Sequence, residues 1–117
     1  MPYGKLLESL VGAVHGARAA LLLDRVGEVV LEAGEHADRH RLIAAYQGIV
    51  LATARRSLTR LSAGGLHYML WRYEAGHVIA RPLKDGYYLV ISLARDGDLA
   101  HGIHRSAETQ ERMNAEL

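Results

Sequence analysis

The sequence predicts a single α+β domain, residues 1–117, whose elements follow the order α-β-β-α-β-β-β-α. Three observations predict this class. A chain of 117 residues supplies one hydrophobic core rather than two. A proline-free stretch in the middle of the chain is long enough for an extended helix. Several short apolar runs of strand length are joined by glycine-containing turns, and such short turns require antiparallel pairing.

The N-terminal third of the chain predicts one helix and a β-hairpin. Over Pro2–Val14 the larger apolar side chains recur on one 3.6-residue face, and a proline suits the first turn of a helix. Ala17–Asp24 is a short apolar run, and Glu28–Ala33 (EVVLEA) is a second run of strand length. Because Gly27 between them accepts a positive φ, the two runs are predicted to pair as a hairpin.

A long helix is predicted over Arg39–Ser62, with Asp38 as its N-cap and the pair Gly64-Gly65 as its stop. The larger apolar side chains of this helix cover about 200° of its surface, whereas packing against one sheet requires only about 100°. This excess predicts a second packing partner for the helix.

Three strands and a helix are predicted in the remainder of the chain, with Asp98 as the N-cap of the helix. These elements cover Leu66–Tyr73, His77–Arg81, Tyr87–Ala94 and Leu99–Glu116. The run Tyr87–Ala94 is apolar on both faces, which predicts a central strand with the first strand beside it.

The other predicted strands include two edges of different character. Glu28–Ala33 carries glutamates, which protect an edge against pairing, whereas Leu66–Tyr73 is aromatic on both faces. A bare aromatic edge favours aggregation, so we expect a second copy of the chain to cover it. The residues expected at this homodimer interface are Tyr46, Ile49, Leu66, Tyr68, Met69, Trp71 and Tyr73.

A flank of small residues on the long helix predicts another close contact. Gly48 in mid-helix costs about 1 kcal/mol relative to alanine, so something is expected to compensate for it. Close approach of the helix of a dimer mate and close approach of a binding partner both remain open. The residues expected to bind a partner are Arg41, Ala44, Ala45, Gly48, Ala52 and Arg55.

Charge also favours a protein partner. The segment from Asp38 to Ser62 carries five arginines and one acid, a basic surface that would steer an acidic protein. The whole chain has a net charge of +1, which argues against nucleic-acid binding. Without an apolar run of membrane-spanning length or a signal-peptide core, we expect a cytoplasmic protein with no membrane insertion.

Two stretches and the central helix resemble the roadblock family, in particular its small prokaryotic members of the MglB type. The stretches are Gly16–Val30 (GARAALLLDRVGEVV) and His77–Ile91 (HVIARPLKDGYYLVI), and the helix ends in Gly-Gly as in the family. The last helix opens with Leu99-Ala100, where members often have Leu-Gly. The resemblance implies a five-stranded antiparallel sheet with the long helix on one face and the terminal helices on the other.

The resemblance further implies a homodimer that binds a small Ras-like GTPase and has no catalytic site or cofactor of its own. Such a protein either promotes GTP hydrolysis by its partner or only serves as a scaffold, and the sequence leaves both open. An arginine inserted beside the transferring phosphate would come from a loop, with Arg25 and Arg95 as the candidates.

Enzyme and ligand-binding alternatives receive less support from the residues. The sequence has no cysteine, no phosphate-binding glycine loop and no His-Glu-x-x-His motif, so no metal or nucleotide site is predicted. The alternative function is a small-ligand sensor domain of the profilin, PAS or GAF type. That function requires a pocket of about 300 Å³ between sheet and helix, where Tyr46, Ile49, Val50 and Leu70 are expected to fill the space.

Overall fold

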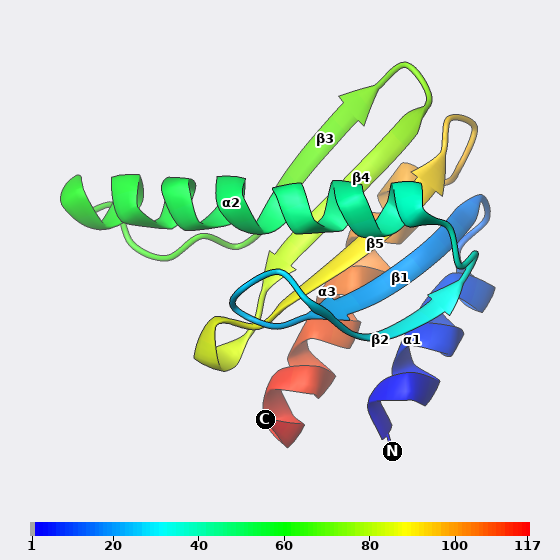
Figure 1. Ribbon diagram of the computed structural model, residues 1–117, viewed down its shortest axis with the longest axis horizontal. Coiled ribbons are helices and arrows are strands. Elements are labelled where there is room, and N and C mark those ends of the chain that lie inside the picture. Colours follow the sequence, from blue (N-terminus) through cyan, green and yellow to red (C-terminus); the bar gives the residue numbers. More distant parts are fainter. Residues whose placement is uncertain (1) are drawn as a thin grey trace.

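A five-stranded antiparallel sheet separates two layers of helices in this protein (Figure 1). The structure, a computed structural model, describes residues 2–117. Its elements are α1 (Pro2–Ala13), β1 (Ala17–Leu23), β2 (Val29–Gly34), α2 (Asp38–Arg60), β3 (Met69–Tyr73), β4 (Gly76–Pro82), the 3-10 turn η1 (Lys84–Gly86), β5 (Tyr88–Ala94) and α3 (Leu99–Glu116). The predicted fold class and element order are confirmed.

The strands lie in the order β2-β1-β5-β4-β3, and all neighbours pair antiparallel. The predicted placement of β5 at the centre with β1 beside it is therefore confirmed. Both predicted edges are confirmed as well, since β2 and β3 each have only one neighbour. At the β1–β2 turn, Gly27 has a φ of +85°, as the hairpin prediction requires.

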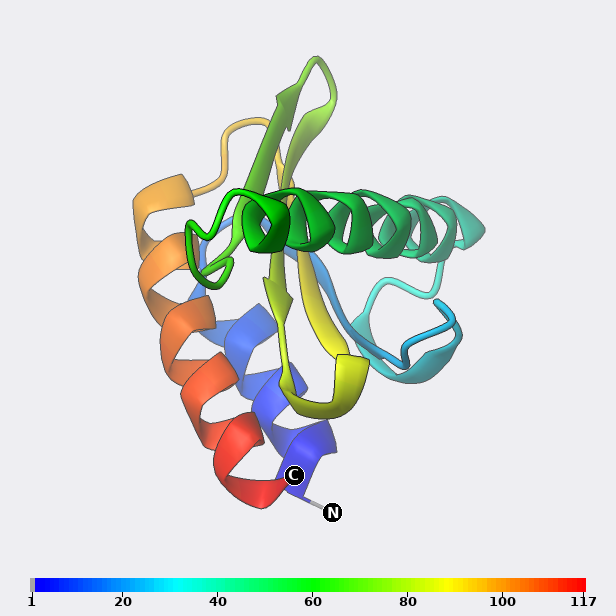
Figure 2. The same ribbon diagram turned by 90° about the vertical axis from the view of Figure 1, so that its left-hand side faces the viewer.

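Side chains alternate across the sheet and form two separate cores. On one face, α2 packs over small and branched residues of the central strands, such as Ala19, Val78 and Val90. On the other face, α1 and α3 cover larger side chains, including Leu22, Ile79 and Ile91 (Figure 2). This arrangement agrees with the layers that the family resemblance implied.

Helix α2 extends beyond the sheet at its C-terminal end (Figure 1). From Ala52 onward most of its residues are exposed, in contrast to the buried His40, Ala44, Gln47 and Leu51 that come before. None of the helices described in residues 2–117 combines the length and the apolar character that crossing a bilayer requires.

Two local predictions are wrong. The N-cap of α2 is Ala37 rather than Asp38, because Asp38 is already helical and its carboxylate pairs with Arg41 at 3.3 Å. The edge strand begins at Met69 rather than Leu66, since residues 66–68 do not pair with β4 in the ladder. Asp98, by contrast, is confirmed as the N-cap of α3, where its Oδ1 accepts from the His101 N–H at 3.1 Å.

Candidate functional site

Helix α2 exposes an apolar stripe on the side that faces away from the sheet. Leu42, Tyr46 and Ile49 follow one another at helical spacing and are 59%, 56% and 64% exposed. A helix that packs on one sheet needs no apolar residues there. The expected excess of apolar surface on α2 is therefore present.

The β3 edge presents a second apolar surface. Alternation along the strand places Met69, Trp71 and Tyr73 on the face that α2 covers, and Trp71 and Tyr73 are each more than one-third exposed. Tyr68 lies on the opposite face, where the Arg81 guanidinium stands 4.5 Å from the centre of its ring. Leu66 is half-buried and packs against the core beneath α2, so most of it already has a partner within the protomer.

The small residues of α2 separate into two groups. Ala44 is fully buried against the sheet, so its predicted place on a binding surface is wrong. Ala45, Gly48 and Ala52 line a surface groove of about 290 Å³ between α2 and the β1–β2 hairpin. We call this depression the hairpin groove.

Sequence reasoning missed the hairpin side of this groove. Arg25, Val26 and Gly27 form that side, and Ile49 and Arg56 complete the α2 side. Val26 is 75% exposed, although valine rarely occupies a hairpin tip. That unusual turn residue is the sequence feature that could have identified the groove.

Gly48 is required by the protein itself. A Cβ at this position would overlap the phenol of Tyr88, with the Cζ atom only 2.8 Å away. The Tyr88 hydroxyl passes beneath the helix and donates to the Ala44 carbonyl oxygen at 3.1 Å. Burial raises the pKa of Tyr88 to about 12, so the phenol stays protonated as the donor. The expectation that an outside partner compensates for Gly48 is thus replaced by a contact within the core.

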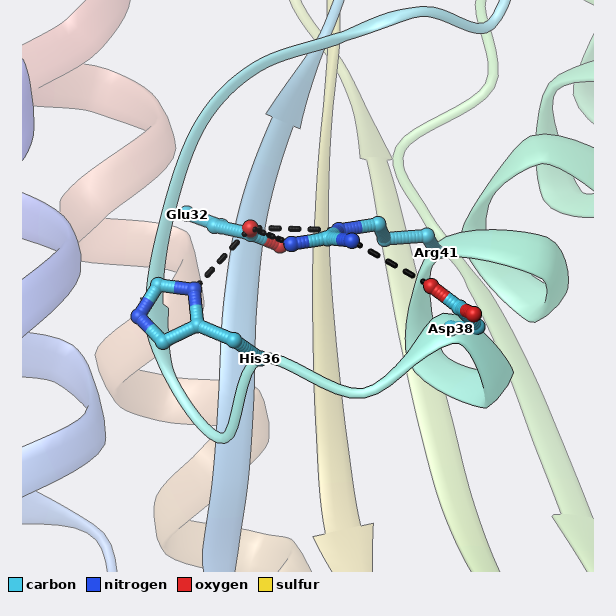
Figure 3. Close-up of polar contacts among 4 residues, drawn as sticks. All are labelled: Glu32, His36, Asp38 and Arg41. Carbon is cyan, nitrogen blue, oxygen red and sulfur yellow. Dashed lines mark hydrogen bonds and ion pairs between the residues drawn. The ribbon is translucent and has the colours of Figure 1, made fainter.

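Arg41 is also held within the protomer. Its Nε donates to both carboxylate oxygens of Glu32 at 3.1 Å, and its Nη1 contacts Asp38 at 3.3 Å (Figure 3). His36 Nδ1 lies 3.0 Å from the same Glu32 carboxylate. This network joins β2 to the start of α2. Arg41 therefore positions these two elements, and its predicted role in partner binding is not supported.

The network makes folding stability depend on pH. The Arg41 guanidinium holds the pKa of Glu32 at about 2, well below its ordinary 4.5, while Glu32 raises the pKa of Arg41. Because the folded-state pKa of Glu32 is depressed, its contribution is present above pH 4.5 and is lost as the pH falls toward 2. Water screens the pair, so we expect a loss of about 1–2 kcal/mol rather than the full shift. Denaturant unfolding at pH 7 and pH 3 measures it, and Glu32→Gln should remove this part of the pH dependence.

The side chain of Gln47 is buried between α2 and the sheet, and its amide makes no hydrogen bond among the described residues. Among the described residues, neither its Nε2 nor its Oε1 has a hydrogen-bond partner, and the side chain is fully buried. A buried polar group that makes no hydrogen bond destabilises the folded state.

We therefore expect Gln47→Met, which preserves the volume, to raise the free energy of unfolding by about 1 kcal/mol. Gln110→Met is the matched control. The Gln110 amide accepts from Arg81 at 3.2 Å and donates to the Pro82 carbonyl at 2.7 Å, so this change should destabilise the protein. Urea unfolding at fixed protein concentration compares the two. A loss of stability in Gln47→Met would contradict the assignment.

Arg55 is the last of the residues predicted to bind a partner. Arg55 is exposed on the projecting end of α2 and lines two further surface depressions. His40 is buried with its Nε2 3.6 Å from Glu35, and His104 lies 3.5 Å from Glu108. Within residues 2–117, no three His, Cys, Asp or Glu side chains are close enough together to hold a metal ion.

Comparison with known proteins agrees with the fold. Residues 3–93 match the family described as the Roadblock/LC7 domain. The fold is similar to a Roadblock/LC7 domain from Streptomyces avermitilis at 19% identity, with a TM-score of 0.85 over 97% of this chain and 95% of that one. A search of curated protein sequences finds no match.

Two proteins from Myxococcus xanthus have similar structures. MglB superposes with a TM-score of 0.86 at 11% identity, over 98% of this chain and 94% of that one. MglC superposes with a TM-score of 0.77 at 24% identity, over 100% of both chains. The resemblance noted in the sequence is therefore confirmed, and because the family match covers most of its length, the chain belongs to the Roadblock/LC7 domain family.

Proposed function

We propose that this protein is a homodimeric, non-enzymatic regulator that binds a small Ras-like GTPase. Membership of the Roadblock/LC7 family supports the proposal. The observation that carries it is the apolar surface that α2 and β3 leave uncovered in the protomer. Tyr46, Ile49, Trp71 and Tyr73 are all exposed on this surface. Exposed aromatic and aliphatic surface of this kind is typical of protein interfaces.

The β3 edge is the proposed centre of the dimer. Met69–Tyr73 pairs with β4 on one side only, which leaves backbone N–H and C=O groups along the other side. A second copy of β3 would satisfy these groups and extend the sheet across both protomers. Tyr46 on α2 would then add apolar contact area next to this seam, whereas Ile49, also predicted for the dimer interface, lines the hairpin groove.

The GTPase is proposed to bind on the other flank of α2, at the hairpin groove. Ala45, Gly48 and Ala52 form its α2 wall, and Arg55 lies farther along the same helix. Strands β1 and β2 lie on the opposite half of the sheet from β3. The hairpin groove therefore lies on the half of the sheet away from the proposed dimer seam.

Co-elution with GTPases tests the proposal. A small Ras-like GTPase from the same organism, loaded with GTP or GDP, should co-elute with this protein in at least one nucleotide state. The chain alone should not bind GTP in calorimetry, because its sequence has no phosphate-binding loop. Phosphate release by the GTPase, measured with and without this protein, distinguishes an activator from a scaffold. Stoichiometric GTP binding by the isolated chain, or no co-elution with any such GTPase, would overturn the proposal.

A further inference from the structure

Three surface depressions follow one another along α2. The hairpin groove is the first, with a volume of about 290 Å³. The second, also of about 290 Å³, lies at Arg55, Arg56 and Arg60, and the third, of about 390 Å³, lies between Arg55 and the loop after α2. Arg56 belongs to the first and second, and Arg55 belongs to the second and third, so neighbouring depressions share lining residues. We call this row of depressions the α2 channel.

The α2 channel is basic. Arg25, Arg55, Arg56 and Arg60 line it, and none of its lining residues in the described part of the chain is acidic. Among the ion pairs of residues 2–117, none includes these arginines. Arg25 donates only to the carbonyl oxygen of Asp85, at 3.0 Å, and Arg56 donates to Thr53 Oγ1 at 3.4 Å. Four guanidiniums along one channel therefore lack a carboxylate.

The hairpin end of the α2 channel also exposes apolar side chains. Val26 on the hairpin and Ile49 on α2 stand on its two sides, 75% and 64% exposed, and Ala45 and Ala52 lie beside them. Two exposed aliphatic side chains with small residues between them form a site for one apolar side chain of a ligand. The channel thus combines two exposed aliphatic side chains at the hairpin, next to Arg25 and Arg56, with further guanidiniums toward the end of α2.

We propose that the α2 channel binds an acidic segment of a protein partner, with one apolar side chain of that segment between Val26 and Ile49. The inference rests on the proposed function, since it specifies the chemistry of the partner at the same flank. Along the helix, Ile49 lies about 10 Å from Arg56 and about 16 Å from Arg60. An extended chain covers these distances in about three to five residues. The segment therefore carries carboxylates about three to five positions from its apolar residue.

The lining residues distinguish this ligand from other anions. The α2 channel has no aromatic side chain among its described lining residues, whereas single-stranded nucleic acid binds through stacking on aromatics. A membrane would contact a protruding part of the protein surface rather than fill a groove. A peptide segment fits both the concave shape and the combination of exposed aliphatic side chains with guanidiniums.

A labelled peptide of about ten residues, with one leucine and glutamates about three to five positions away, is the probe. Fluorescence anisotropy should show saturable binding that weakens at least about tenfold in Arg56→Glu/Arg60→Glu and falls with added salt. Val26→Ser, and replacement of the peptide leucine by serine, should each weaken binding about fivefold or more. Arg39→Glu is the matched control, because Arg39 is exposed on α2 outside the channel, and it should bind like the wild type.

Other outcomes overturn the inference. One is that the peptide does not bind, and another is that the serine peptide binds as tightly as the leucine peptide. A third is that Arg39→Glu weakens peptide binding as much as Arg56→Glu/Arg60→Glu does. The last is that anionic vesicles or an oligothymidylate bind more tightly than the peptide. Circular dichroism verifies that each variant is folded. If the GTPase co-elutes while the peptide does not bind, the inference fails and the proposed function stands. If the peptide binds but no GTPase does, the proposed function fails instead.

Discussion

Replacing Trp71 with glutamate should convert the dimer into a monomer of 12.9 kDa at micromolar concentration. Trp71 lies on the free edge strand and is 39% exposed. In a two-fold dimer through β3, the substitution places two carboxylates close to the symmetry axis. An unpaired charge at a desolvated seam costs about 3 kcal/mol or more, which weakens association at least about a hundredfold.

Val30→Glu is the matched control for Trp71→Glu. Val30 lies on the opposite edge strand, β2, and is 48% exposed, so the same charge is introduced at an edge that the proposed dimer does not use. Sedimentation equilibrium over a hundredfold range of concentration measures both variants beside the wild type. A dimeric Trp71→Glu variant, or dissociation by Val30→Glu alone, would assign the interface to a different surface.

Gly48→Ala should destabilise the isolated protein by about 2 kcal/mol, although glycine to alanine in a helix ordinarily stabilises by up to about 1 kcal/mol. The reversal comes from Tyr88, whose phenol occupies the space that a Cβ would need. The ring cannot move away cheaply because it is buried and its hydroxyl donates to the Ala44 carbonyl. Gly12→Ala in α1 should show the ordinary gain, since nothing lies within 4 Å of a Cβ there.

A double-mutant cycle identifies the cause of the Gly48 effect. In a Tyr88→Phe background, Gly48→Ala should cost less, because the hydroxyl that lies nearest to the new methyl group is gone. Thermal and urea unfolding at one fixed protein concentration measure all four proteins, since dimer formation couples stability to concentration. A stabilising Gly48→Ala would instead show that the glycine serves contacts outside the protomer.

Local rules determined most of the fold from the sequence. Turn residues such as Gly27, the capping residue Asp98 and the two-sided apolar run in β5 each specify their own conformation or burial within a few residues. Antiparallel pairing then follows because the connections are short. The errors at Asp38 and Leu66 arose where a side-chain contact competed with the local signal. The contact is the Asp38–Arg41 ion pair within α2 in one case and core packing beneath α2 in the other.

The candidate site depended on contacts between distant parts of the chain. The small-residue flank of α2 was visible in the sequence, yet its division into buried Ala44 and groove-lining Ala45 required the direction from which the sheet approaches the helix. Glycine is required at position 48 because of Tyr88, which is forty residues away in the sequence. Arg41 is held by a hydrogen bond to Glu32, which lies on another element.

The sequence by itself thus determined the elements, the class, the edges and the excess of apolar surface on α2, because these follow from periodicity and turn chemistry over short stretches. Only the tertiary structure decided which arginines remain without a carboxylate and where the hairpin meets α2. Periodicity gives the angle of a side chain around its own helix. The identity of its neighbour is decided by packing between segments that are far apart in the chain, and no local pattern encodes that packing.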